Sequence, residues 1–104
     1  MKKNLLKETL EVLWEHGKKP EDVKWCGKPE YGWCTWDEFC SVAKDIEYDS
    51  GYGTAMIAEN LLIVGEDWWL ERREYDGAEW WVFKSLPVKP KVHRVPMQVL
   101  KTLF

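Results

Sequence analysis

The chain has 104 residues, which is enough for one domain with a single modest core. It holds no apolar run near the roughly 20 residues that cross a bilayer. No apolar segment follows its basic start, so we expect a cytoplasmic protein without a secretory signal or membrane contact. The net charge of −3 hides three blocks, since residues 1–36 carry +1, residues 37–79 carry −9 and residues 80–104 carry +5. Such polarity favours electrostatic partner choice or pairing between copies, although a solvated acidic surface with a basic tail is the plainer interpretation.

A first helix is expected over residues 4–16. Gly17 and Pro20 follow this segment as stop signals. Lys and Glu mix on its polar face, which predicts a helix that packs on the core of the protein and not on a membrane. The apolar residues that recur at helical spacing are Leu6, Leu10, Leu13 and Trp14, with Leu5 and Thr9 beside them.

The next segment is predicted to hold one strand and a second helix. Val23–Cys26 alternates as a short strand does, and residues 27–32 have the composition of a turn. Thr35 and Glu38 have the spacing of a capping box, so a helix is expected from Trp36 to about Ile46. The side chains expected to be buried there are Phe39, Val42, Ala43 and Ile46.

The second half of the chain predicts a three-stranded antiparallel meander. A loop is expected over residues 48–53 and a short helical turn over residues 54–59. The three predicted strands cover residues 61–64, 68–75 and 79–86. Asp76-Gly77 between the last two strands is a strong signal for a hairpin turn.

The C-terminal segment should differ from the rest. Its three prolines favour an extended chain, and residues 97–104 are expected to form a final helical turn or an added strand. The elements together predict one α+β domain over residues 1–87. A basic, proline-containing segment over residues 88–104 is expected to pack on that domain or to extend from it.

The predicted hairpin has two faces, because side chains alternate along a strand. With a two-residue turn at Asp76-Gly77, the face expected in the core carries Trp68, Leu70, Arg72, Trp81 and Phe83. The other face carries Trp69, Glu71, Arg73, Trp80 and Val82. Each face pairs an arginine with a tryptophan, which suits a cation–π contact. Glu74 would lie opposite Glu79, which is destabilising unless an arginine or a partner relieves the repulsion.

Exposed tryptophan and arginine are the residue types most enriched at binding hot spots. The candidate partner-binding residues are therefore Trp69, Arg73, Trp80, Glu71, Asp49, Tyr52, Glu74 and Asp76. The plainer interpretation is that the tryptophans close a core that one sheet and two helices share. A register slip by one residue would exchange the two faces.

No metal, cofactor or catalytic residue is predicted. The spacing C-x7-C-x5-C of Cys26, Cys34 and Cys40 lacks the C-x2-C element of structural zinc sites, and an odd count fits reduced thiols. Acids such as Asp49 and Glu71 would supply a carboxylate pair, but neither a paired histidine nor a nucleophile motif accompanies them.

Three segments resemble a family of small proteins encoded in bacterial phages, prophages and other mobile elements: Tyr48–Gly53, Asp67–Arg72 and Glu74–Lys84. The resemblance covers roughly residues 8–87 and carries no settled biochemical role. It implies a context, because small acidic proteins of such elements often bind host proteins. Anti-CRISPR inhibitors are one such group, and some present carboxylates where a host nuclease expects phosphates.

We therefore expect a non-enzymatic protein-binding module of phage or mobile-element origin, acting in the cytoplasm of the host bacterial cell. An inhibitor that binds a CRISPR nuclease through an acidic and aromatic surface is the specific form of this hypothesis. The alternative is a nucleic-acid-binding accessory protein that uses the basic C-terminal segment and exposed tryptophans. A further hypothesis is a homodimer in which the basic segment of one copy meets the acidic middle of another. A small enzyme is the last hypothesis.

Overall fold

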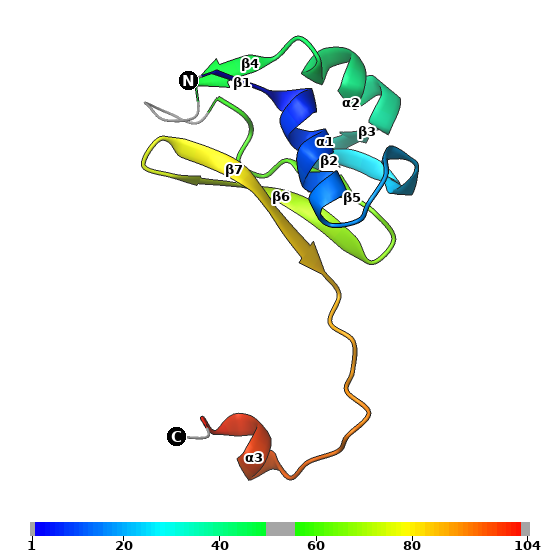
Figure 1. Ribbon diagram of the computed structural model, residues 1–104, viewed down its shortest axis with the longest axis vertical. Helices are drawn as coiled ribbons and strands as arrows, with labels where there is room; N and C mark the ends of the chain where they lie inside the picture. The colour runs from blue at the N-terminus through cyan, green and yellow to red at the C-terminus, as the bar shows by residue number, and fades with distance from the viewer. Residues whose placement is uncertain (1, 50–55, 103–104) are drawn as a thin grey trace.

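A computed structural model of the chain describes residues 2–49 and 56–102 (Figure 1). The fold is α+β, with helices and antiparallel sheets, as predicted. A five-stranded sheet has the order β3-β2-β5-β6-β7, formed by Gly32–Cys34, Trp25–Lys28, Leu62–Val64, Trp68–Tyr75 and Ala78–Ser85. A two-stranded sheet pairs β1 with β4, which are Lys2–Asn4 and Glu47–Asp49. The helices are α1, α2 and α3 over Leu5–Glu15, Trp36–Ala43 and Pro96–Leu100, with a 3₁₀ turn at Pro20–Asp22.

Helix α1 confirms the first predicted helix. Asn4 caps it, because its side-chain oxygen accepts a hydrogen bond of 3.0 Å from the Lys7 backbone N–H. The predicted apolar stripe was partly wrong, since Leu10 is 38% exposed and Trp14 is 82% exposed. The helix instead presents Leu5, Thr9 and Leu13 to the core, a row of i, i+4 neighbours.

Helix α2 begins with the predicted capping box. Glu38 N–H donates to Thr35 Oγ1 at 3.1 Å, and Thr35 N–H donates to Glu38 Oε1 at 2.9 Å. The helix ends at Ala43, three residues before the predicted end. Phe39 and Ala43 are buried as expected and Ile46 is half-buried against the core, but Val42 is 61% exposed, because it lies on the side of the helix away from the core.

The predicted three-stranded meander exists as β5, β6 and β7, but the sheet has two more strands. The predicted turn over residues 27–32 is confirmed at residues 29–31, but residues 27, 28 and 32 are strand, because β2 and β3 form a tight hairpin in which Gly27 pairs with Trp33. The turn itself is shorter and holds Glu30 at a φ of 65°. The first strand also starts later than predicted, at Trp25.

The expected loop over residues 48–53 is wrong at its start. Tyr48 and Asp49 belong to β4, which pairs with β1 in the register Lys3↔Tyr48 and Lys2↔Asp49. Tyr48 is 1% exposed, so this small sheet carries a core residue. A helical turn was also expected over residues 54–59. Among these, residues 56–59 are described, and they form bends and the start of a turn, so the prediction is wrong there. Residues 50–55 of both predictions lie outside the described ranges.

The tryptophan hairpin is confirmed, register included. Strand β6 covers residues 68–75 as predicted, and Arg72↔Trp81 and Glu74↔Glu79 pair as predicted. Asp76 and Gly77 both have positive φ, at 51° and 88°, as a type I′ turn requires.

The core lies between the sheet and the two long helices. The sheet contributes Cys26, Ile63, Leu70, Trp68 and Trp81, and helices α1 and α2 contribute Leu5, Leu13, Phe39 and Ala43. Cys26, Ile63, Leu70 and Phe83 form one row across four strands, because each pairs with the next. This row defines the inner face of the sheet.

The C-terminal segment leaves the domain as an extended arm that ends in α3 (Figure 1). Its last backbone contact with the sheet is the hydrogen bond from Leu86 N–H to Asp67 C=O, at 2.8 Å. Residues 86–102 are exposed throughout. The arm explains a radius of gyration of 17.0 Å, against about 13 Å for a compact domain of this length. No helix in residues 2–49 and 56–102 has the length and apolarity needed to cross a membrane.

Candidate functional site

The outer face of the five-stranded sheet gathers four tryptophans from four different strands. Antiparallel neighbours point to the same side, so the pairs Trp25↔Val64, Val64↔Trp69 and Trp69↔Lys84 form one row across the sheet. The parallel row next to it runs from Trp33 through Gly27, Leu62 and Glu71 to Val82. Arg73 and Trp80 form the last pair, towards the hairpin turn.

We call this surface the open face, made of Trp25, Trp33, Leu62, Val64, Trp69, Glu71, Arg73, Trp80, Val82 and Lys84. Both long helices lie on the inner side of the sheet, and among the described residues no helix crosses the open face (Figure 1). Its apolar side chains therefore cover one another only in part. Trp33 is 69% exposed and Trp80 is 39% exposed. An aromatic surface of this extent is the kind that marks an interaction site.

Glu71 organises the polar part of the open face. Its carboxylate accepts a hydrogen bond of 2.8 Å from Trp69 Nε1 and forms ion pairs with Arg73 at 2.8 Å and Lys84 at 3.3 Å. The Trp69 hydrogen bond is the main reason that the pKa of Glu71 is lower than usual, and Lys84 and Arg73 add to the effect. The contacts hold the Trp69 ring in place and neutralise the acid at the centre of the face.

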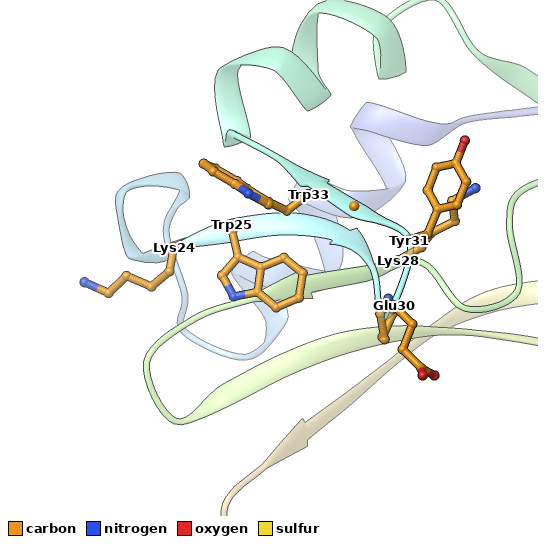
Figure 2. A pocket seen from close by; sticks show the side chains of 8 residues that line it. Lys24, Trp25, Lys28, Glu30, Tyr31 and Trp33 are labelled. Atoms are coloured by element: carbon orange, nitrogen blue, oxygen red, sulfur yellow. The ribbon is translucent and has the colours of Figure 1, made fainter.

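A groove at the β2–β3 end of the open face lies between Trp25 and Trp33 (Figure 2). Its volume is about 570 Å³, and its walls are mainly aromatic and aliphatic carbon. Lys24 and Lys28 line the same groove, and Lys28 Nζ lies 4.1 Å from the centre of the Tyr31 ring. Glu30 also lines the groove, which thus combines flat aromatic surfaces with two lysines and one acid.

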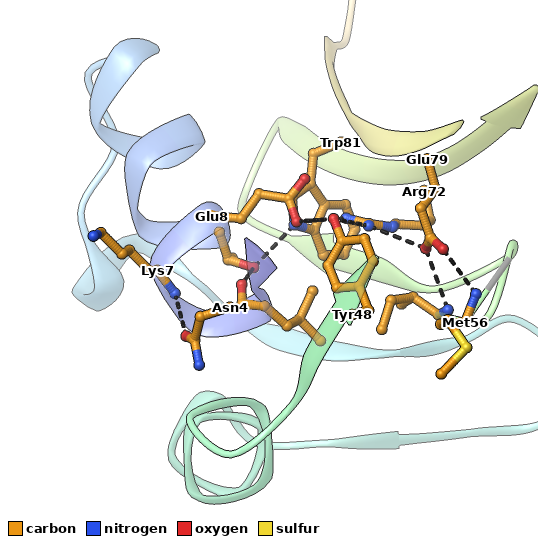
Figure 3. A network of polar contacts seen from close by, with 11 residues as sticks. Asn4, Lys7, Glu8, Tyr48, Met56, Arg72, Glu79 and Trp81 are labelled. Atoms are coloured by element: carbon orange, nitrogen blue, oxygen red, sulfur yellow. Dashed lines mark hydrogen bonds and ion pairs between the residues drawn. The ribbon is translucent and has the colours of Figure 1, made fainter. Parts of the chain in front are cut away.

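The inner face holds a buried polar cluster around Arg72 (Figure 3). Arg72 Nη2 donates to Tyr48 Oη at 2.6 Å and to Glu79 Oε1 at 3.1 Å, and Nη1 lies 3.3 Å from Glu8 Oε1. Tyr48 Oη in turn donates to Glu8. The guanidinium also lies 5.0 Å from the centre of the Trp81 ring, which is the predicted cation–π pair of this face.

Glu79 connects this cluster to a distant segment of the chain. Its two carboxylate oxygens accept hydrogen bonds from the backbone N–H groups of Met56 at 2.7 Å and Ile57 at 3.2 Å. Burial is almost complete for Arg72 at 3% exposure and for Glu79 at 2%. Arg72 forms ion pairs with both Glu8 and Glu79, while its Nε and Nη1 have no hydrogen-bond partner among the described residues. The cluster thereby holds β4, α1 and the 56–57 segment on the sheet and contributes to structure.

The structure brings together half of the predicted partner-binding residues. Trp69, Glu71, Arg73 and Trp80 share the open face. Glu74 points to the other side and accepts a hydrogen bond of 2.9 Å from Gly77 N–H in the turn, where Asp76 is exposed. Asp49 belongs to the two-stranded sheet, and Tyr52 lies outside the described residues.

Trp25 and Trp33 were missing from the predicted site. The available signal was the alternation Trp25-Cys26-Gly27, followed across a short turn by Trp33-Cys34, which places both tryptophans on one face and both cysteines on the other. The glycines Gly27 and Gly32 hid that signal, because glycine ordinarily marks a turn.

The three cysteines are free thiols on the inner side of the β2–β3 hairpin and on α2. Burial raises the pKa of Cys26 to about 12, and the nearby Cys34 and Cys40 add to that increase. The described part of the chain contains no group of histidine, cysteine, aspartate or glutamate side chains arranged to hold a metal ion.

Comparison with known proteins finds no matching family model, no similar curated sequence and no similar solved structure. These comparisons do not bear on the resemblance to mobile-element proteins, which stays a prediction.

Proposed function

We propose that this protein is a non-enzymatic binding module whose open face docks on another protein. The observation that supports the proposal most directly is the set of four tryptophans on a sheet face that lacks a covering helix among the described residues. Tryptophan and arginine dominate binding hot spots, and Arg73 lies beside Trp80 on this surface. Glu71 positions the Trp69 ring in advance, which lowers the entropy cost of binding.

The partner that the sequence resemblance suggests is a host protein of the bacterial cell, with a CRISPR nuclease as the specific form. Such a nuclease holds nucleic acid in channels lined by lysine and arginine. The acidic block over residues 37–79 has the complementary charge, and its exposed acids include Asp37, Glu38, Asp45 and Glu47. In this arrangement the open face provides the apolar contact, and the net negative charge of the acidic block attracts a positively charged partner at long range.

The hypothesis of a CRISPR nuclease as partner is tested with the purified nuclease. Its binding to this protein is measured by interferometry, and its cleavage of DNA is measured in parallel. The variant Trp25→Ala/Trp69→Ala removes two rings from the open face. Trp14→Ala is the matched control, since Trp14 is 82% exposed on α1. We expect the double variant to bind at least tenfold more weakly and the control to bind as wild type does. Equal binding by all three proteins would contradict the role of the open face.

Nucleic acid is the second candidate ligand, because Lys24 and Lys28 line the groove between Trp25 and Trp33. Bases would stack on the rings while the lysines and the basic arm contact phosphates. Titration with a fluorescent single-stranded oligonucleotide at several salt concentrations tests it. A steep fall in affinity with salt supports this candidate, and undetectable or salt-independent binding removes it.

A further inference from the structure

The five-stranded sheet has β3 and β7 as its two edge strands, and β7 is the longer of them. β7 is the last strand in the order and covers Ala78–Ser85, and among the described residues only β6 pairs with it. Natural proteins protect such edges with charges, prolines or bulges. The centre of β7, from Trp80 to Phe83, carries none of these devices.

The hydrogen-bond pattern shows which groups of β7 point away from the sheet. Leu86 N–H bonds to Asp67 C=O, and in an antiparallel pair such bonds recur at every second residue. On the opposite side of β6, Arg72 N–H bonds to Leu61 C=O, which agrees with this alternation. The residues whose backbone groups point outward are therefore Glu79, Trp81, Phe83 and Ser85.

We infer that two copies of this chain pair through β7, antiparallel and across a twofold axis, to form one continuous ten-stranded sheet. A second copy is the occupant that this edge fits, because a twofold axis lets one strand meet its own copy in antiparallel register. The register that uses all four outward residues pairs Trp81 with Phe83 of the second copy and Glu79 with Ser85 of the second copy. Val82 then lies on the axis and faces Val82 of the second copy.

This register also matches side chains on the open face. Trp80 of each copy lies opposite Lys84 of the second copy, so the ring packs on the aliphatic part of a lysine whose ammonium pairs with Glu71 of its own chain. Trp80 is 39% exposed in the single chain, and its ring is thus available for such a contact. The two open faces join into one surface.

Charge complementarity supports the same arrangement. In the antiparallel pair, the end of β7 in one copy lies beside the start of β7 in the second copy. The basic arm, with Lys89, Lys91 and Arg94, therefore leaves the sheet next to the hairpin turn of the second copy, where Glu74 and Asp76 lie. Residues 86–104 carry +4 and residues 1–85 carry −7, so arm and domain attract between copies.

Helix α1 does not close over this edge. The helix contacts β7 through the hydrogen bond from Trp81 Nε1 to Thr9 Oγ1, and a groove of about 520 Å³ lies beside this contact. Its lining includes Lys7, Glu11 and Glu15 of α1 together with Trp80 and Trp81 of β7. The edge is open in the plane of the sheet, because among the described residues only β6 pairs with β7.

The proposed dimer is tested in the full chain by placing charged residues at Val82, which lies on the twofold axis. Val82→Lys and Val82→Glu each place like charges opposite each other, so we expect each variant alone to dimerise roughly tenfold more weakly in sedimentation velocity. An equimolar mixture of the two variants should restore the dimer, because Lys then faces Glu. Val42→Lys and Val42→Glu are matched controls, since Val42 is 61% exposed on α2.

Hydrogen exchange gives an independent measurement that does not depend on any variant. Raising the concentration of wild type should protect the amides of Trp81 and Phe83, while those of Trp80 and Val82 stay protected throughout. A single-chain mass at every concentration would overturn the proposal. So would a dimer that both Val82 variants leave unchanged.

Discussion

Arg72 and Glu79 form an ion pair inside the protein, with Arg72 Nη2 3.1 Å from Glu79 Oε1 and side-chain exposures of 1% and 0%. Both side chains start from a hairpin whose turn lies only a few residues away, at Asp76-Gly77. The ion pair also removes the repulsion expected between Glu74 and Glu79, because the two carboxylates bind different partners. Glu79 turns to Arg72 and the 56–57 backbone, and Glu74 turns to Gly77 N–H.

Glu79→Ala should be one of the most destabilising substitutions in the chain. It would leave Arg72 with less compensation in the core and remove the acceptor of Met56 N–H and Ile57 N–H. Removing one partner of a buried ion pair costs about 3–5 kcal/mol of unfolding free energy. Urea denaturation followed by circular dichroism measures it, with exposed Glu66→Ala as control, expected within about 0.5 kcal/mol of wild type. A loss below about 1 kcal/mol for Glu79→Ala would show that the ion pair is not compensating the charge.

Two glycines of the β2–β3 hairpin should respond differently to a methyl group. A Cβ on Gly27 would lie 2.3 Å from Gly32 O and 2.7 Å from Trp33 Cα, which are backbone atoms that cannot move aside alone. A Cβ on Gly32 would meet no atom within 4 Å. We expect Gly27→Ala to cost about 1–3 kcal/mol or more and Gly32→Ala to be close to neutral. Thermal denaturation of the two variants measures this difference, and equal melting temperatures would contradict it.

The indole N–H of Trp69 should report the protonation of Glu71. The pKa of Glu71 is lowered, first by its hydrogen bond from Trp69 and then by Lys84 and Arg73. The carboxylate therefore contributes stability above its unfolded pKa of about 4.3, and this contribution is lost as pH falls through the lower folded value. In NMR spectra, the Trp69 indole resonance should shift in that acid range. Glu71→Gln should abolish the shift, and a shift that persists in this variant would assign it to another group.

Tyr48 should make the protein less stable at alkaline pH. Burial and the hydrogen bond to Glu8 raise the pKa of Tyr48 to about 12, against about 10 in an unfolded chain. Between these values the folded state binds more protons than the unfolded state, so stability falls as pH rises through this window. Tyr48→Phe should flatten the fall, while Tyr31→Phe should not, because Tyr31 is 81% exposed. The pKa of Cys26 is also raised, to about 12, so the free energy of unfolding keeps some dependence on pH in both variants. Urea unfolding at a series of pH values measures the slopes, and parallel curves for wild type and Tyr48→Phe would refute this assignment.

The hairpin was predictable because its information is local. Asp76-Gly77 sets the turn, the turn sets the register, and the register sorts every side chain of β6 and β7 onto a face. The capping box at Thr35 and Glu38 is local in the same sense and was predicted correctly at its start.

The elements that sequence reasoning missed depend on distant contacts. β1 and β4 have three residues each and pair across more than forty positions, so neither shows a pattern of its own. Leu10 and Trp14 fit an apolar stripe as well as Leu5, Thr9 and Leu13 do. The second stripe is the one that meets the sheet, where Leu5 and Leu13 join the core and Trp81 Nε1 donates to Thr9 Oγ1 at 2.9 Å.

The candidate site was half predictable for the same reason. Trp69, Arg73 and Trp80 follow from the hairpin alone, whereas Trp25 reaches the open face only because β2 pairs with β5. Alternation placed Arg72 on the core face, but its burial depends on Glu8, which comes from a helix far away in the chain. Patterns in a single sequence carry no signal for a contact between residues so far apart in the chain.

The arm after Ser85 also acts as a tether. Ten extended residues, 86–95, reach roughly 35 Å at most, so α3 is confined to a small volume around the end of β7. Within that volume its local concentration is on the order of millimolar, whatever the concentration of the protein in solution. A surface that binds α3 only weakly on its own would therefore be occupied once the sheet has docked beside it. The exposed side chains of Met97, Val99 and Leu100 would then add avidity to the docking proposed for the sheet, as a second, intramolecular binding step.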